Sequence, residues 1–143
     1  MVTIHVEIKA QGPMFEGERA NAIVEKAVDR GIAELVQLGE QRLDMLLKPR
    51  PAGVYLSVSE AKRGQASTGH YGRSIHGVAS HLHGRIDDSG VEYGPWLEGV
   101  SSRNETTRFK GYHSFRRVGQ SLEKDAGKVL KAHMDKAIKE LNT

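Results

Sequence analysis

Apolar and polar residues alternate at the start of the chain. Every second residue from Val2 to Ile8 is apolar, and a polar residue stands between each pair. A period of two puts the apolar side chains on one face of a strand and the polar ones on the other. The segment therefore predicts a β-strand with one buried face, and Gly12 and Pro13 break the pattern after it.

The next apolar positions recur at spacings of three and four, from about Phe15 to Leu47. They are Ile23, Val24, Ala27, Val28, Ile32, Leu35, Val36, Leu43, Leu46 and Leu47. This spacing predicts a long amphipathic helix that stops before Pro49. Gly31 and Gly39 each weaken a helix by about 1 kcal/mol relative to alanine, so the pattern allows a bend or an interruption near either of them.

Short strands are expected in the middle of the chain. Apolar residues alternate once from Val54 to Val58. Two further strands, roughly Arg73 to Ala79 and His81 to Asp87, would pair as a hairpin. Asp88, Ser89 and Gly90 then predict a turn.

A second helical pattern closes the chain. Its members are Val118, Leu122, Ala126, Val129, Leu130, His133, Ala137, Ile138 and Leu141. The order is an N-terminal strand, a long amphipathic helix, a small mainly antiparallel sheet and a C-terminal helix, which predicts an α+β fold with both helices on one sheet face. A length of 143 residues with 38% hydrophobic content fits a single domain over residues 1–143.

Charge and composition narrow the choice of partners. A net charge of +3 and an isoelectric point near 9.2 make the protein mildly basic. This suits a polyanion such as DNA that passes nearby better than DNA that is bound sequence-specifically. The absence of cysteine excludes disulfides and thiolate metal sites, and is typical of a protein assembled in a reducing cytoplasm. We expect no membrane association, because neither a signal peptide nor a membrane-spanning apolar run is visible.

Four histidines are close together in the sequence. They are His70, His76, His81 and His83. His81 and His83 would share one face of the predicted strand, a spacing at which two imidazoles can meet a metal ion. The third ligand is missing from this pattern, because Asp87 and Asp88 fall in a predicted turn. We therefore favour structural or surface roles for these histidines and expect no metal site.

The chain shows no catalytic motif. No serine stands in a Gly-x-Ser-x-Gly elbow, and the sixteen glycines do not form a phosphate-binding loop followed by lysine and serine or threonine. We therefore expect neither enzymatic activity nor a cofactor.

The stretch from Tyr93 to Val118 carries the strongest functional signal. Pro95 favours a turn or the first turn of a helix, which Gly99 would end. Trp96 is the one tryptophan of the chain, and we expect it to be an anchor in the core or in a subunit contact.

The segment from Val100 to Gly111 is polar and positively charged, so we expect a loop that is mobile in the free subunit and ordered in a contact. At the predicted helix start, Arg116 and Arg117 stand where the helix dipole disfavours cations. Carboxylates of another subunit or phosphate would offset this cost. The expected interface comprises Trp96, Arg103, Arg108, Lys110, Arg116 and Arg117.

Three segments carry a family resemblance over about residues 15–143. Thr68 and Gly69 precede the strand start Arg73-Ser74-Ile75, and the aromatic turn from Tyr93 to Gly99 follows. A loop then leads to a helix start with Tyr112, Phe115, Arg116 and Arg117. This order resembles the tail-completion or neck proteins of long-tailed bacteriophages, the minor tail protein Z-like family, which are related in fold to the tail terminators.

The resemblance implies a structural virion protein of the tail or neck, assembled in the host cytoplasm. Its subunits would form a ring, with a hexamer favoured, between the capsid connector or stopper and the tail tube. DNA would pass through the lumen without sequence-specific binding. The alternative from the basic loop and the histidines is a small nucleic-acid-binding or metal-dependent nuclease domain.

Overall fold

The computed structural model of the chain describes residues 1–9, 17–47 and 70–142. In chain order the elements are β1 (Val2–His5), α1 (Glu18–Leu47), α3 (His70–Arg73), β2 (His76–Ser80), β3 (His83–Asp87), α4 (Gly94–Glu98), α5 (Arg103–Thr106) and α6 (Ser114–Leu141). The predicted α+β order is confirmed. The strand expected from Val54 to Val58 and the helix start expected at Phe15 lie outside the described residues.

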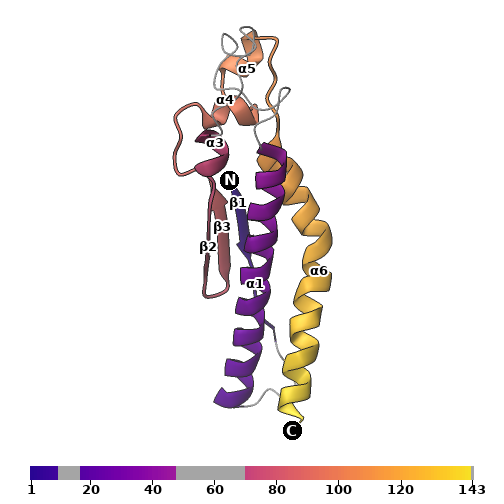
Figure 1. The fold of residues 1–143 in the computed structure, drawn as a ribbon. Coiled ribbons are helices and arrows are strands. Elements are labelled where there is room, and N and C mark those ends of the chain that lie inside the picture. Colours follow the sequence, from indigo (N-terminus) through magenta and orange to yellow (C-terminus); the bar gives the residue numbers. More distant parts are fainter. Residues whose placement is uncertain (10–16, 48–69, 143) are drawn as a thin grey trace.

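The long helices α1 and α6 run side by side in opposite directions, and the sheet lies against them (Figure 1). We call these two helices and the sheet the stem. Gly39 of α1 lies against both Ile86 of β3 and Leu122 of α6, so the stem is one continuous layer of packing between the helices and one sheet face. The expected placement of both helices on one face of the sheet is confirmed.

The sheet has the order β1-β3-β2, and both pairings are antiparallel. Ile86 of β3 pairs with Val2 on one side and with Gly77 on the other. Val6 lies beyond the end of β1, but its N–H still donates to the Leu82 carbonyl at 3.2 Å. The period of two at the N-terminus therefore predicted the buried face correctly and overestimated the strand's length.

The hairpin strands begin later than expected. The short helix α3 occupies His70–Arg73, and Ser74 N–H still bonds back to the carbonyls of His70 and Tyr71. His81 and Leu82 form the tip between β2 and β3, and Leu82 adopts a left-handed backbone with φ of 56°. The expectation that His81 and His83 share one strand face is therefore wrong.

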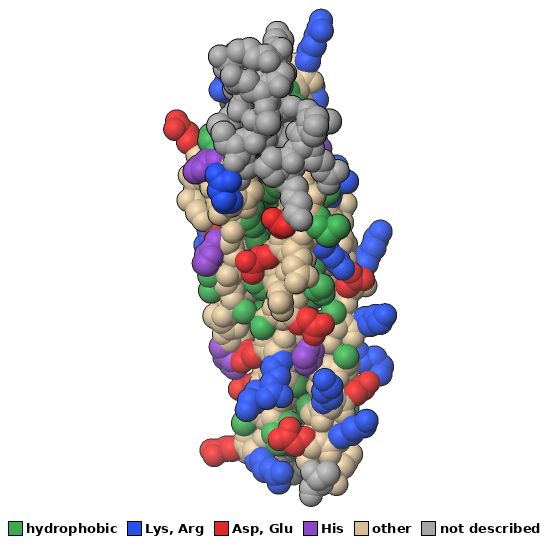
Figure 2. Space-filling view, viewed as in Figure 1, with side chains coloured by type: hydrophobic (Ala, Val, Ile, Leu, Met, Phe, Trp, Pro, Cys, Tyr) green, Lys and Arg blue, Asp and Glu red, His purple; other side chains and the backbone are tan. Residues whose placement is uncertain are grey.

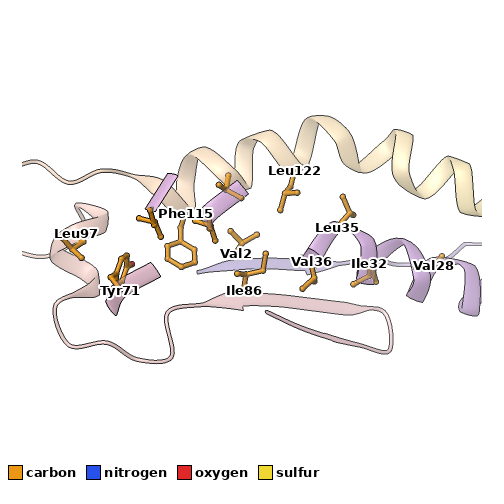
Figure 3. Packing of buried hydrophobic residues seen from close by; sticks show 13 residues of the cluster. Val2, Val28, Ile32, Leu35, Val36, Tyr71, Ile86, Leu97, Phe115 and Leu122 are labelled. Carbon is orange, nitrogen blue, oxygen red and sulfur yellow. The ribbon is translucent and has the colours of Figure 1, made fainter. Parts of the chain in front are cut away.

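The core extends along the stem and continues to α3 and α4 (Figure 3). Its most deeply buried residues are Ile32, Leu35, Leu43, Ile86 and Leu97. Gly31 and Gly39 do not interrupt α1. A Cβ on Gly31 would lie 2.6 Å from Leu130 Cδ2, and one on Gly39 would lie 2.3 Å from Ile86 Cδ1. These glycines let α6 and β3 approach α1 closely, which outweighs their low helix propensity because apolar burial there is shared by three elements.

Candidate protein interface

The aromatic turn forms the short helix α4 at one end of the stem (Figure 1). Pro95 stands in its first turn, where its missing N–H costs nothing. Gly99 ends the helix in a left-handed conformation, with φ of 99°, and its N–H donates to the Pro95 carbonyl at 3.0 Å. The predicted start and end of this element are confirmed.

Two glycines close the loop that follows. A Cβ on Gly111 would lie 2.3 Å from Gly99 Cα, so the backbones at the two ends of the loop are in contact. Next to this contact, Tyr112 N–H donates to the Leu97 carbonyl at 2.7 Å and His113 N–H donates to the Glu98 carbonyl at 3.2 Å. The loop therefore leaves and re-enters the fold at one point. We call α4, α5 and residues 99–111 the loop end.

Asn104 organises the inside of the loop end. Its side chain is buried, with 4% exposed. The amide nitrogen donates to the carbonyls of Trp96 at 3.0 Å and Phe109 at 3.2 Å, and the amide oxygen accepts from Ser101 N–H at 3.0 Å. The Asn104 side chain thus joins α4, the residue before the start of α5 and the segment that returns from the loop toward α6. This internal network is contrary to the expectation that the loop lacks order of its own.

Lys110 and Phe109 also make contacts within the loop end. The Lys110 ammonium group donates to the Asn104 carbonyl at 2.7 Å and to the Glu105 carbonyl at 3.2 Å. The Phe109 ring lies 4.6 Å from the Trp96 ring and 5.0 Å from the Tyr112 ring, measured between centroids. Trp96 is half-buried and packs against the core. Its indole N–H is buried and has no acceptor among the described residues.

Glu98 supplies the negative charge expected near the start of α6. Its carboxylate accepts hydrogen bonds from Phe115 N–H and Arg116 N–H, both at 3.0 Å. A carboxylate at this position satisfies free amides and is favoured by the helix dipole. The anionic neighbour that we expected from another subunit or from phosphate is therefore present within the chain.

The predicted arginines lie on separate surfaces. Arg103 and Arg108 are exposed on the loop end. Arg116 lines a hollow of about 480 Å³ between β1 and α6. Arg117 lines a different hollow, of about 370 Å³, together with Met45 of α1. Within the described residues, no ion pair involves these four guanidinium groups. The helix rotates successive side chains by about 100°, which separates two arginines that are neighbours in sequence.

The His81 side chain contacts Asp29 of α1 and forms no metal site with His83 of β3 among the described residues. Its Nδ1 lies 2.9 Å from Asp29 Oδ2, and Leu82 N–H donates to Asp29 Oδ1 at 2.8 Å. The hydrogen bond and charge of Asp29 raise the pKa of His81. Burial raises the pKa of Asp29, but the hydrogen bonds from Leu82 and His81 outweigh it and leave that pKa below its usual value. Residues 1–9, 17–47 and 70–142 contain no group of three His, Asp or Glu side chains placed to hold a metal ion.

Sequence reasoning missed the two residues that build the loop end, Asn104 and Glu98. An asparagine in a polar loop gives no signal of burial, and Glu98 is far in sequence from the helix amides that it binds. The available signal was the glycine at each end of the loop, at positions 99 and 111, because glycine permits both the positive φ and the close backbone contact found there.

Comparisons with known proteins add no relative: no family model, no curated protein and no solved structure matches this chain. The resemblance to phage neck proteins therefore stays a prediction. None of the helices in the described part of the chain is long and apolar enough to cross a membrane.

Proposed function

We propose that this chain is a non-enzymatic subunit of a ring at the head–tail junction of a long-tailed bacteriophage. In that role it would join the capsid connector or stopper to the tail tube and leave a lumen for DNA. Whether it completes or terminates the tail is a finer distinction within the same proposal. The proposal requires a rigid body with contact loops at its ends and no chemistry of its own.

The observation that carries the proposal is the loop end. It stands at one end of the elongated stem, its backbone is held by Asn104 and Lys110, and it exposes Arg103 and Arg108. An ordered loop loses little conformational entropy when a partner binds, which favours its use as an interface. The two exposed arginines can form bidentate bonds with carboxylates of a neighbouring protein.

The oligomeric state tests the proposal. Mass photometry and negative-stain electron microscopy of the purified protein should show rings with a central opening. Loss of rings in Arg103→Ser/Arg108→Ser would place the loop end in the assembly, and Arg19→Ser is a matched control because Arg19 is an exposed arginine in the first turn of α1. A protein that is monomeric at all concentrations and stays separate from phage tails would contradict the proposal.

One surface favours the nucleic-acid alternative. Arg117, Lys124, Lys128 and Lys131 are exposed and are spaced by seven, four and three residues, which places them on one face of α6. Lys and Arg side chains line this side of the molecule in Figure 2. The Lys131 ammonium group already pairs with Asp135 at 2.7 Å. A charged helix face is most often solvated, so this surface supports a second candidate and does not displace the first.

A DNA gel shift separates the two candidates. Binding of double-stranded DNA at ~0.1 M salt that weakens steeply as salt increases would favour the nucleic-acid-binding domain. In that case Lys124→Gln/Lys128→Gln should reduce binding uniformly across DNA sequences. Rings that leave DNA unshifted under the same conditions would favour the neck subunit.

A further inference from the structure

The three-stranded sheet has two open edges among the described residues. Strand β3 is central, so β1 and β2 each have a partner strand on one side only. The hydrogen bond from Val6 N–H to the Leu82 carbonyl fixes which residues of β1 are directed at β3. Because backbone groups alternate along an antiparallel strand, those of Thr3 and His5 are directed outward.

The same alternation applies to β2. Gly84 and Ile86 of β3 direct their backbone N–H and C=O groups at β1, so the alternate residues of β3, such as Arg85, direct theirs at β2. On β2 this leaves Gly77 and Ala79 with outward N–H and C=O groups. Unpaired edges of this kind bind further strands readily unless they are covered.

The directions of the two edge strands allow them to pair between copies. Strands β1 and β2 are both antiparallel to β3, so they run in the same direction. A second copy rotated about an axis along the strands would present its β2 parallel to β1 of the first copy. Contacts between unlike edges repeat from copy to copy and close into a ring when the rotation allows it.

Shape and charge favour contact between unlike edges. Beside β1, the hollow of about 480 Å³ has an apolar floor that includes Leu35 and Phe115, and both Arg116 and Glu123 line it. Beside β2, a Cβ on Gly77 would lie 2.6 Å from Glu40 Oε1, so this edge carries a carboxylate from α1. Unlike edges bring Arg116 toward Glu40, whereas two β2 edges would oppose Glu40 to itself.

We propose that the open edge of β1 binds the β2 edge of a second copy of this chain, so that one sheet continues from subunit to subunit. This inference rests on the proposed ring and names the contact that builds it. The helix layer would continue with the sheet, since α6 of one copy would lie next to α1 of the following copy.

Disulfide trapping tests the contact, because the chain contains no cysteine. Thr3 and Val78 pair with Arg85 from opposite sides, so within one chain their Cα atoms are two strand spacings, about 9.5 Å, apart. A disulfide requires Cα atoms within about 7 Å, so Thr3→Cys/Val78→Cys can form a bond only between copies. The proposal fixes which two strands pair between copies but not which residue of β2 lies opposite Thr3. Thr3→Cys is therefore also combined with His76→Cys and with Ser80→Cys.

We expect at least one pair to give a ladder of multimers on a non-reducing denaturing gel after brief oxidation, while each single variant migrates as a monomer on that gel. The control Thr3→Cys/Lys128→Cys places the second thiol on the far side of α6 and measures random collision. An equal ladder from this control, or dimers from Thr3→Cys alone, would overturn the inference. Rings without any ladder would overturn it and leave the proposed function standing. A protein that is monomeric in solution and gives no ladder would overturn both the edge contact and the proposed ring.

Discussion

In the stem, the side chains of Ile32, Leu43 and Ile86 have no exposed surface and contact other apolar groups from three elements. In the loop end, Leu97 of α4 still belongs to this apolar core. In residues 100–111, which follow α4, the buried side chain is instead Asn104, which makes three hydrogen bonds to backbone groups. Apolar burial is not directional and is shared among many contacts, whereas each hydrogen bond in the loop has one defined partner. Substitutions in the stem should therefore lower the unfolding free energy of the whole protein, whereas substitutions in residues 100–111 should disturb the loop end alone.

Ile86→Ala should produce the largest effect. It removes a fully buried side chain between both helices, and such truncations cost about 2–5 kcal/mol of unfolding free energy. Urea denaturation followed by circular dichroism measures the loss. Val78→Ala is the matched control on the same sheet, because Val78 is 51% exposed and should change the free energy by less than about 0.5 kcal/mol. Equal losses in both variants would contradict the assignment of the core.

Asn104→Ala should cost about 1–3 kcal/mol, because the carbonyls of Trp96 and Phe109 lose their donor inside the loop end. Hydrogen exchange should show lost protection in residues 99–112 and an unchanged stem. Glu105→Ala is the control, since it alters an exposed neighbour whose backbone carbonyl still accepts from Lys110. If protection were lost across the stem as well, the two regions would form one cooperative unit and the comparison would fail.

Glu98→Ala should cost about 1 kcal/mol, because two amides at the start of α6 lose their acceptor. Glu98→Gln should fall between the alanine variant and the original protein, since its amide keeps one acceptor oxygen but no charge. Thermal unfolding compares the three proteins. A glutamine variant as stable as the original would show that the charge contributes nothing at this position.

The contact between the hairpin tip and α1 should depend on pH. Because the pKa of His81 is raised in the fold, its contribution is complete below the unfolded value of 6.5 and is lost as pH rises through the folded value. Because the pKa of Asp29 is lowered, its contribution is present above 3.8 and is lost as pH falls through the folded value. Titration of His81 by NMR should give a pKa above 6.5 that returns toward 6.5 in Asp29→Asn. An unchanged pKa in that variant would contradict the contact.

The smallest effect is expected for Arg103→Ser/Arg108→Ser, which should leave stability within about 0.5 kcal/mol because both side chains are exposed. Lys110→Ser should cost more, about 1 kcal/mol, because its ammonium group holds two carbonyls of α5. Chemical denaturation separates the two variants. Equal and negligible losses would mean that Lys110 belongs with the free arginines of the surface.

Local periodicity was enough to predict most of the fold. The alternation from Val2, the two helical patterns and the turn at Asp88 are properties of neighbouring residues, and each is found in the structure. The hairpin boundaries were wrong by a few residues, because α3 and the left-handed Leu82 depend on contacts that the pattern does not contain. In the same way, α4 could be predicted from Pro95 and Gly99, since both act through their own backbone angles.

Patterns along the chain were sufficient to predict the α+β order, the apolar faces and the position of the charged loop. Packing between distant elements decided that Gly39 permits close packing, that Glu98 binds the start of α6 and that Asn104 holds the loop end. It also decided that Arg116 and Arg117 belong to different surfaces. The two kinds of information differ because periodicity fixes which way a side chain faces on its own element, whereas the partner of that side chain depends on how distant elements pack together.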